Sequence, residues 1–223
     1  MSRIYISSSW KNPRQPYLVE ELRKRGHKVY DFRHPSGRND SNVWESVSKK
    51  HGLNDAYVQG TLVTADFKDM LSDEDSIDRF KEHFDAMNDA DTCILLLPCG
   101  RSSHIEAGYM AGAGKRVFVM DMSQEVTPEL MYLALDGYFD SLDELYKAVD
   151  KPIPGVCRIC GCTEDNPCWH PDHGSCWWVD KTHTLCSHCA EEDNFALRGH
   201  RYLTIKDKPE TEHCINDKSK AFK

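Results

Sequence analysis

The apolar run at residues 92–98, with the sequence TCILLLP, is the feature that most constrains how this chain folds. It lacks the polar alternation of a strand that exposes one face to water. It is also far shorter than the roughly 20 apolar residues that a membrane span requires. Such a run is typical of a strand that is buried on both faces of a parallel sheet. The run therefore predicts an α/β fold.

Strands and helices are expected to alternate along residues 1–150. Period-two alternation predicts strands, and apolar residues at helical spacing predict helices. The expected strands span residues 2–7, 27–32, 92–98 and 115–120, with a short edge strand at 138–139. The expected helices span residues 12–26, 43–50, 72–87, 104–113, 127–135 and 141–149. This order predicts an open, mainly parallel sheet flanked by helices, of the Rossmann-like or flavodoxin-like class.

Local signals mark the starts of two of these helices. Asn12 followed by Pro13 is a typical helix start, because asparagine caps free amides and proline presets the backbone. A capping box from Ser72 to Asp75 is expected to begin the helix before the buried strand. Residues 33–71 are irregular apart from 43–50, and we expect them to form an excursion that covers a site.

Charge and composition bound the class of protein and its domains. The formal net charge of −8 repels nucleic-acid phosphates, so DNA binding is disfavoured. The N-terminal residues lack the apolar segment of a signal peptide, and we expect a cytoplasmic protein without membrane contact. The expected organisation is an α/β domain at residues 1–150, a linker at 151–156, a cysteine-rich module at 157–205 and a charged tail at 206–223.

Eight of the ten cysteines lie after residue 156, and their close spacing favours metal binding over disulfides. A four-thiolate zinc site is predicted from two C-x-x-C pairs that are 25 residues apart, Cys157, Cys160, Cys186 and Cys189. A second zinc site is possible from the donors between them, Cys162, Cys168 and Cys176, completed by His170 or His173. An iron–sulfur cluster has the same four-cysteine ligation and stays an alternative.

The cysteine-rich module is too small to bury enough apolar surface by itself, so a metal ion would supply much of its stability. Its role is open between a purely structural or oligomerising part and a recognition surface. The aromatic residues Trp169, Trp177 and Trp178 would suit stacking on single-stranded bases. The acidic run at residues 191–193 argues against that use.

The segment after the buried strand, CGRSSHIEAGYMAGAGK, carries a carboxylate, Glu106, near the start of a helix rich in small residues. In open α/β sheets, ligands bind at the carboxyl ends of the strands, where loops lead into helices. The loop contains Gly100, Ser102 and Ser103, which can form a tight turn and donate to an oxygen-rich ligand. A partly desolvated carboxylate here can attack an electron-poor carbon, although a surface charge favoured by the helix dipole explains it as well.

Three segments together resemble the nucleoside 2-deoxyribosyltransferases and the related nucleotide N-glycoside hydrolases. They are IYISSSWKN at residues 4–12, DTCILLL at 91–97, and HIEAGY at 104–109 with Gly112, Gly114 and Lys115. The likeness spans most of residues 1–150. The resemblance implies a retaining reaction in which Glu106 attacks C1′ of a ribosyl or deoxyribosyl group and the base leaves with a proton. It also implies a homo-oligomer, a dimer or larger.

The resemblance extends to further residues near the site. It implies that the loop after the first strand lies near base and sugar, which corresponds here to Ser7, Ser8, Ser9 and Trp10. An aspartate of the family, eight residues before Asp91, corresponds here to His83, and Asp85 is the nearest carboxylate.

Three more residues have candidate roles that follow from their place in the sequence. Tyr109, three residues after Glu106, is a candidate to hold its carboxylate or to be a core aromatic. Arg101 and His104 can meet a 5′-phosphate or stay solvated.

The leading hypothesis is therefore cleavage or transfer at the N-glycosidic bond of a nucleoside or nucleotide. One alternative is cleavage of the nicotinamide riboside bond of NAD, since a glutamate nucleophile suits that leaving group too. Another is a catalytically silent nucleotide-binding sensor with a zinc-ribbon module that contacts a partner. A DNA-binding zinc protein with an α/β dimerisation domain is disfavoured by the net charge.

Overall fold

The computed structural model describes residues 1–35, 42–123, 126–171 and 174–190. The chain divides into two compact units, residues 2–149 and a second unit that begins at Asp150. Each unit is described by itself. None of the helices in the described ranges has the length and apolar character of a membrane-spanning segment.

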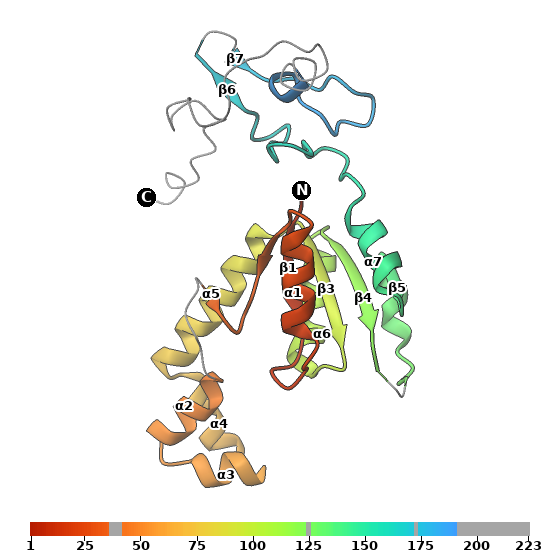
Figure 1. Ribbon diagram of the computed structural model, residues 1–223. Coiled ribbons are helices and arrows are strands. Elements are labelled where there is room, and N and C mark those ends of the chain that lie inside the picture. Colours follow the sequence, from red (N-terminus) through yellow and green to blue (C-terminus); the bar gives the residue numbers. More distant parts are fainter. Residues whose placement is uncertain (36–41, 124–125, 172–173, 191–223) are drawn as a thin grey trace. The chain divides into compact units, whose positions relative to one another are not determined.

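The first unit is built on a five-stranded parallel sheet in the order β2-β1-β3-β4-β5, shown in Figure 1. The strands are β1 (Arg3–Ser7), β2 (Lys28–Tyr30), β3 (Thr92–Leu97), β4 (Arg116–Asp121) and β5 (Gly137–Phe139). All six residues of β3 are buried, and the strand lies at the centre of the sheet. The predicted α/β class is confirmed, and the short strand near residues 138–139 is an edge strand as expected.

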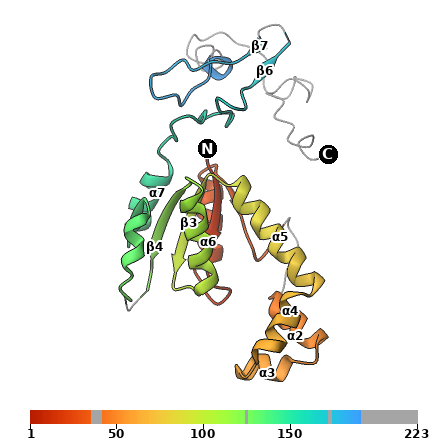
Figure 2. The same ribbon diagram turned by 180° about the vertical axis from the view of Figure 1, so that it is seen from behind.

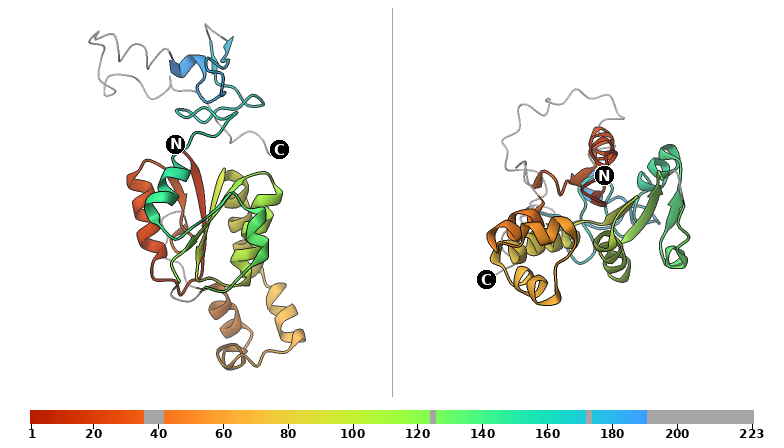
Figure 3. Two further views of the ribbon diagram at one scale, coloured as in Figure 1. Left: turned by 90° about the vertical axis from the view of Figure 1, so that its right-hand side faces the viewer. Right: turned by 90° about the horizontal axis from the view of Figure 1, so that it is seen from below.

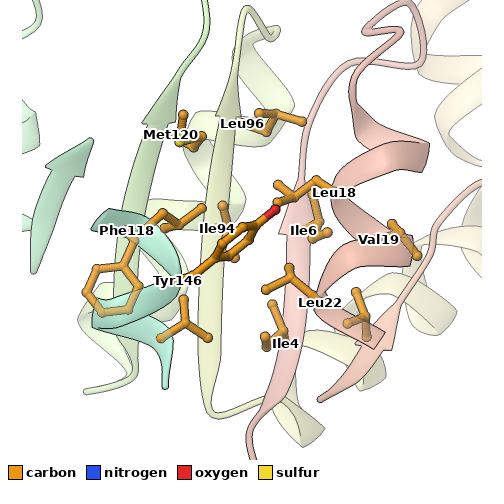
Figure 4. Packing of buried hydrophobic residues seen from close by; sticks show 13 residues of the cluster. Ile4, Ile6, Leu18, Val19, Leu22, Ile94, Leu96, Phe118, Met120 and Tyr146 are labelled. Atoms are coloured by element: carbon orange, nitrogen blue, oxygen red, sulfur yellow. The ribbon is translucent and has the colours of Figure 1, made fainter. Parts of the chain in front are cut away.

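Helices cover both faces of the sheet (Figure 3, left). One face packs against α1 (Gln15–Lys24) and α7 (Leu142–Val149), as Figure 4 shows for their contacts with β1, β3 and β4. The other face packs against α5 (Glu74–Asp89) and α6 (Arg101–Gly112), which lie in front of the sheet in Figure 2. Alternate residues of β1 serve the two faces: Ile4 and Ile6 pack toward α1, whereas Tyr5 packs toward α6.

The excursion between β2 and α5 contains three short helices, α2 (Val43–Lys50), α3 (Asn54–Gln59) and α4 (Thr64–Leu71). They lie beyond the end of the sheet toward which β3 and β4 point (Figure 1). The buried carboxylate of Asp73 fastens them to α5, because it accepts from Lys50 Nζ at 3.0 Å and interacts with His51 Nε2 at 2.8 Å. Only α2 was predicted.

Several helix ends differ from the sequence expectations. Asn12 accepts from the Arg14 amide at 3.0 Å and so caps a turn, while α1 itself begins at Gln15. The α5 cap is Asp73, which accepts from the Asp75 amide at 3.0 Å, so Ser72 lies outside the cap. Residues 130–134 form a 3-10 helix in place of the longer helix expected there.

The start of α6 also differs from the predicted start at residue 104. The helix begins at Arg101, with the extended Gly100 before it, so Glu106 lies in the second turn and not the first. The dipole explanation for its charge is weak there, because the effect falls off within the first turn. Of the small residues on this helix, Ala107 is buried against the sheet, whereas Gly108 and Gly112 are exposed.

The second unit has little regular structure. Its only paired strands within the described residues are the antiparallel pair β6 (Trp169–His170) and β7 (Gly174–Ser175). Isolated bridges join Val156 to Thr163 and Trp178 to Cys186. Its buried core consists chiefly of cysteine side chains, so little apolar area is available to stabilise it.

Replacing Leu96 by alanine tests the core between the sheet, α1 and α7. The Leu96 side chain is 0% exposed, so the free energy of unfolding should fall by about 2–5 kcal/mol, measured by urea denaturation. Leu133→Ala is the matched control, because Leu133 is 84% exposed and its loss should change stability by less than about 0.5 kcal/mol. Equal effects of the two substitutions would contradict this description of the core.

Candidate functional site

Glu106 reaches from the second turn of α6 to the carboxyl end of β1. The hydroxyl of Ser7, the last residue of β1, donates to Glu106 Oε2. The same hydroxyl lies 3.1 Å from the carbonyl oxygen of Ser103. Ser7 is fully buried, whereas Glu106 is partly buried. The Ser7 hydroxyl therefore links the end of β1 to the carboxylate that α6 carries.

Tyr5 provides a second hydroxyl to the same carboxylate. It lies two residues before Ser7 on β1, so both side chains leave the same face of the strand. The Tyr5 hydroxyl acts on the Glu106 carboxyl as a donor does, because it lowers the pKa of that group. Its ring is buried and stacks on Tyr30, with ring centroids 5.5 Å apart. Sequence reasoning missed Tyr5, although the alternation in β1 that pairs it with Ser7 was visible.

Glu106 is held by hydroxyl groups and not by cations. The described part of the chain places no lysine or arginine in an ion pair with it. Burial raises the pKa of the Glu106 carboxyl, and the hydrogen bonds from Ser7 and Tyr5 lower it in part. Burial, and next the charge of Glu106, raise the pKa of Tyr5 well above its usual range, so Tyr5 stays a protonated donor.

Two thiols close to Glu106 are not competing nucleophiles. Burial raises the pKa of Cys99 to about 11, and burial together with the charge of Glu106 raises the pKa of Cys93 further. Both therefore stay protonated at neutral pH.

His83, on α5, lies beside the hydroxyl of Tyr5. Its Nδ1 is 3.5 Å from the Tyr5 hydroxyl, and its ring meets Tyr30 edge-on at 6.0 Å. Asp85, the other candidate on α5, is exposed. The structure thus brings His83 into the group around Glu106 and leaves Asp85 outside it.

Tyr109 does not hold Glu106. Its hydroxyl donates to Asn88 Oδ1 at 2.6 Å, and its ring packs on Phe84 with centroids 4.9 Å apart. Both contacts fasten α6 to α5. Tyr5 has the role that the sequence analysis offered to Tyr109.

The loop after β1 is fixed by internal contacts. The Ser8 hydroxyl donates to the Leu96 carbonyl at 2.9 Å, and the Ser9 hydroxyl accepts from the Lys11 amide at 3.1 Å. Trp10 packs edge-on against Phe32 at 5.3 Å, and Arg33 donates to its carbonyl at 2.6 Å. The loop is therefore held beside the ends of β1 and β3.

The loop before α6 is divided between exposed and engaged residues. Gly100, Arg101 and Ser102 are exposed, whereas Ser103 is buried and its carbonyl oxygen lies 3.1 Å from the Ser7 hydroxyl. The His104 ring interacts with the Gly100 carbonyl and with the Tyr132 hydroxyl, each at 2.9 Å. The His104 ring is therefore held by the loop and by Tyr132, whereas the Arg101 side chain is exposed.

A cavity of about 190 Å³ lies between the start of β1, β2 and the end of α5. Arg3, Lys28 and Asp89 are among the residues that line it. It opens at the amino ends of the strands, opposite to the end where Ser7 meets Glu106. It is therefore not part of the candidate site.

The second unit gathers its cysteines into one cluster that can hold a metal ion. There are two groups of four cysteines, and within each group all sulfur atoms lie within 4.8 Å of one another. One group is Cys157, Cys160, Cys162 and Cys186. The other is Cys162, Cys168, Cys176 and Cys186. Thiolates are donors that zinc prefers. Cys189 is buried in the same cluster but lies outside both groups, as does His170. His173 falls outside the described residues.

The chain matches no protein-family model and no curated protein. Among solved structures, a 2-deoxyribosyltransferase from Bacillus psychrosaccharolyticus is 19% identical, with 64% of this chain and 88% of that chain covered and a TM-score of 0.42. A CMP N-glycosidase from Clostridium botulinum is 13% identical, with 67% and 99% covered and a TM-score of 0.35. A response regulator from Thermotoga maritima is 17% identical, with 67% and 96% covered and a TM-score of 0.36. These three proteins differ in function, so they do not select one for this chain.

Replacing Ser7 by alanine should raise the pKa of Glu106 further, because it removes a donor that favours the charged carboxylate. Loss of a hydrogen bond to a charged group should also cost about 1.5–3 kcal/mol of stability once Glu106 is ionised. Titration of the labelled carboxyl carbon by NMR measures the pKa, and Glu106→Gln identifies its resonance.

The control is Ser8→Ala, since the Ser8 hydroxyl donates to Leu96 and not to Glu106. This substitution should leave the pKa of Glu106 unchanged. The sign can also be checked by stability: a raised folded pKa means that the free energy of unfolding falls as pH rises through that pKa. Ser7→Ala should move this fall to higher pH, and a shift to lower pH would contradict the assignment.

Proposed function

We propose that the first unit cleaves or transfers the N-glycosidic bond of a nucleoside or nucleotide, with Glu106 as the nucleophile. The observation that carries this proposal is a partly buried carboxylate at the carboxyl end of a parallel sheet, held by the Ser7 hydroxyl, with which no lysine or arginine of the described residues forms an ion pair. An ion pair would hold the negative charge and reduce its nucleophilicity. Hydroxyl donors orient the carboxylate and leave its charge available for attack.

In the proposed reaction, a carboxylate oxygen of Glu106 attacks C1′ and the bond from C1′ to the base nitrogen breaks. The bonding electrons leave with the base, and a glycosyl ester forms on Glu106. Water or a second base then attacks C1′ from the opposite face, and Glu106 returns as a carboxylate. The charge of Glu106 is neutralised in the ester, which suits a site that disfavours the ionised form by burial.

The departing base needs a proton, and the proposal assigns its delivery to His83. Histidine is a common general acid near neutral pH. His83 borders the hydroxyl of Tyr5, which contacts the nucleophile, so donor and nucleophile belong to one connected group. In this chain His83 stands where the resemblance implies an aspartate.

The main test is release of free base from deoxynucleosides, deoxynucleotides and NAD, followed by chromatography. Glu106→Gln should lower the rate on the active substrate by on the order of 10³-fold or more while substrate binding persists, because the nucleophile is lost and the shape is kept. Glu144→Gln, an exposed position on α7, is the matched control.

The substrates distinguish the related functions. Release from NAD alone would favour the glycohydrolase alternative. Binding of a nucleotide without release of base from any substrate would favour the sensor. Base release that persists in Glu106→Gln would remove the proposed mechanism.

His83→Asn should slow release of a natural base by about 10²–10⁴-fold, the usual range for loss of a general acid. A sugar derivative with an acidic leaving group, such as a nitrophenolate, needs no proton and should keep nearly its full rate. The same pair of measurements on Asp85→Asn decides between the two α5 residues. Equal loss on both leaving groups in His83→Asn would show that His83 acts by positioning and not by proton transfer.

A further inference from the structure

Arg33 lies in the turn after β2 and reaches across to the loop that follows β1. Its Nη2 nitrogen donates to the carbonyl oxygen of Trp10 at 2.6 Å and to that of Asn12 at 2.8 Å. The carbonyl oxygen of Ser9 lies 3.5 Å from the same nitrogen, a weaker contact. Hydrogen bonds from a charged donor are roughly twice as strong as neutral ones. Three carbonyls of one short loop therefore converge on one cationic nitrogen.

A buried carboxylate fixes the backbone from which the Arg33 side chain extends. Asp31 Oδ1 accepts from the Arg33 amide at 3.0 Å and from Gln15 Nε2 at 2.9 Å. Both Asp31 and Gln15 are buried, and Gln15 is the first residue of α1. The His34 amide donates to the Asp31 carbonyl at 3.0 Å and closes the turn. The guanidinium of Arg33 thus starts from a fixed point at the end of β2.

The loop that Arg33 holds begins beside the carboxylate of the candidate site. The residue before the loop is Ser7, whose hydroxyl donates to Glu106. The two ends of the loop are tied to the neighbouring strand, because Ser8 and Asn12 each donate to a carbonyl at or just beyond the end of β3. Arg33 holds the part between these two ends. A substrate that reaches Glu106 would therefore lie next to the part of the loop that depends on Arg33.

We propose that Arg33 is a positioning residue of the candidate site, which fixes the loop at residues 8–12 beside the substrate and thereby sets the affinity for it. The inference rests on the proposed function, because it needs a substrate at Glu106. Arg33 acts through the loop carbonyls and not on the reacting atoms. A loop that is already held loses less conformational entropy when a ligand binds, so the ligand binds more tightly.

The competing role of Arg33 is structural only, as a stabiliser of this end of the sheet. The two roles predict different kinetics. A loss of general stability lowers the amount of folded enzyme and with it the maximal rate. A loop that is no longer held weakens the binding of the substrate and of the transition state alike, which raises KM and leaves kcat nearly unchanged.

Arg33→Ala should raise KM for the active substrate by about 10- to 100-fold with little change in kcat, because hydrogen bonds to a charged group are lost from the loop. Arg33→Lys should recover part of this loss, since one ammonium nitrogen carries three donors for the same carbonyls. Methylguanidinium at millimolar concentration should also lower the KM of Arg33→Ala, because it can take the place of the missing side chain. Arg25→Ala is the matched control, since the Arg25 guanidinium lies over the Tyr146 ring at the other end of α1.

The position of the loop is measured separately, by fluorine NMR of the full chain labelled with fluorotryptophan. Trp10→Phe identifies the resonance of Trp10. Arg33→Ala should move or broaden this resonance, and methylguanidinium should restore it, whether or not the chain releases a base. Arg33→Gln keeps much of the bulk of the side chain and removes its charge. It is the second variant if Arg33→Ala does not fold, and the same outcomes apply to it.

These measurements separate a failure of the inference from a failure of the proposed function. The role of Arg33 would be overturned by an unchanged Trp10 resonance, by a fall in kcat at constant KM, or by a raised KM that neither Arg33→Lys nor methylguanidinium lowers. A resonance that moves in a chain that releases no base from any substrate would overturn the proposed function instead. The dissociation constant of a nucleotide then replaces KM, and equal constants for the wild type and Arg33→Ala would overturn the role of Arg33 as well.

Discussion

The contact between Ser7 and Glu106 is the interaction on which the candidate site depends. It joins the end of β1 to the second turn of α6 and keeps a carboxylate partly out of water, with no cation among the described residues paired to it. Burial disfavours the charge, and the hydroxyls of Ser7 and Tyr5 offset part of that penalty. The carboxylate is therefore held by hydroxyl donors and not by a cation of the described residues, which is the arrangement that the proposed chemistry requires.

The sheet could be predicted from the sequence because its signal is local. After Thr92 the run at 93–97 is entirely apolar, and it forms most of the fully buried β3. The helices α3 and α4, of 6 and 8 residues, were missed although the equally short α2 was predicted, and helices of this length are not stable by propensity alone. Contacts with α2 and α5 set their position, and the spacing of apolar residues within α3 and α4 does not predict those contacts.

Glu106 was a candidate from its place in the loop and helix that follow the buried strand, and the resemblance then supported it, whereas Ser7 was named from the resemblance alone. Tyr5 was missed because strand alternation gives the face of a side chain but not what lies across from it. Helical spacing left Tyr109 open between holding the carboxylate and being a core aromatic, and in the structure its hydroxyl donates to Asn88 on α5. The overlap of the two cysteine groups also needed the folded geometry, since the C-x-x-C pairs favour a separate four-thiolate site.

Strand β1 carries a further consequence. Ile4 and Ile6 serve the packing beneath α1, while Tyr5 and Ser7 face α6, and the pairing of Ile4 with Thr92 sets this phase. An insertion or deletion of one residue inside β1 would invert the strand, sending hydroxyls into the hydrocarbon layer and isoleucines toward the carboxylate. The packing against α1 and the contact with Glu106 thus depend on the same five residues, so a change of register in β1 would disturb both.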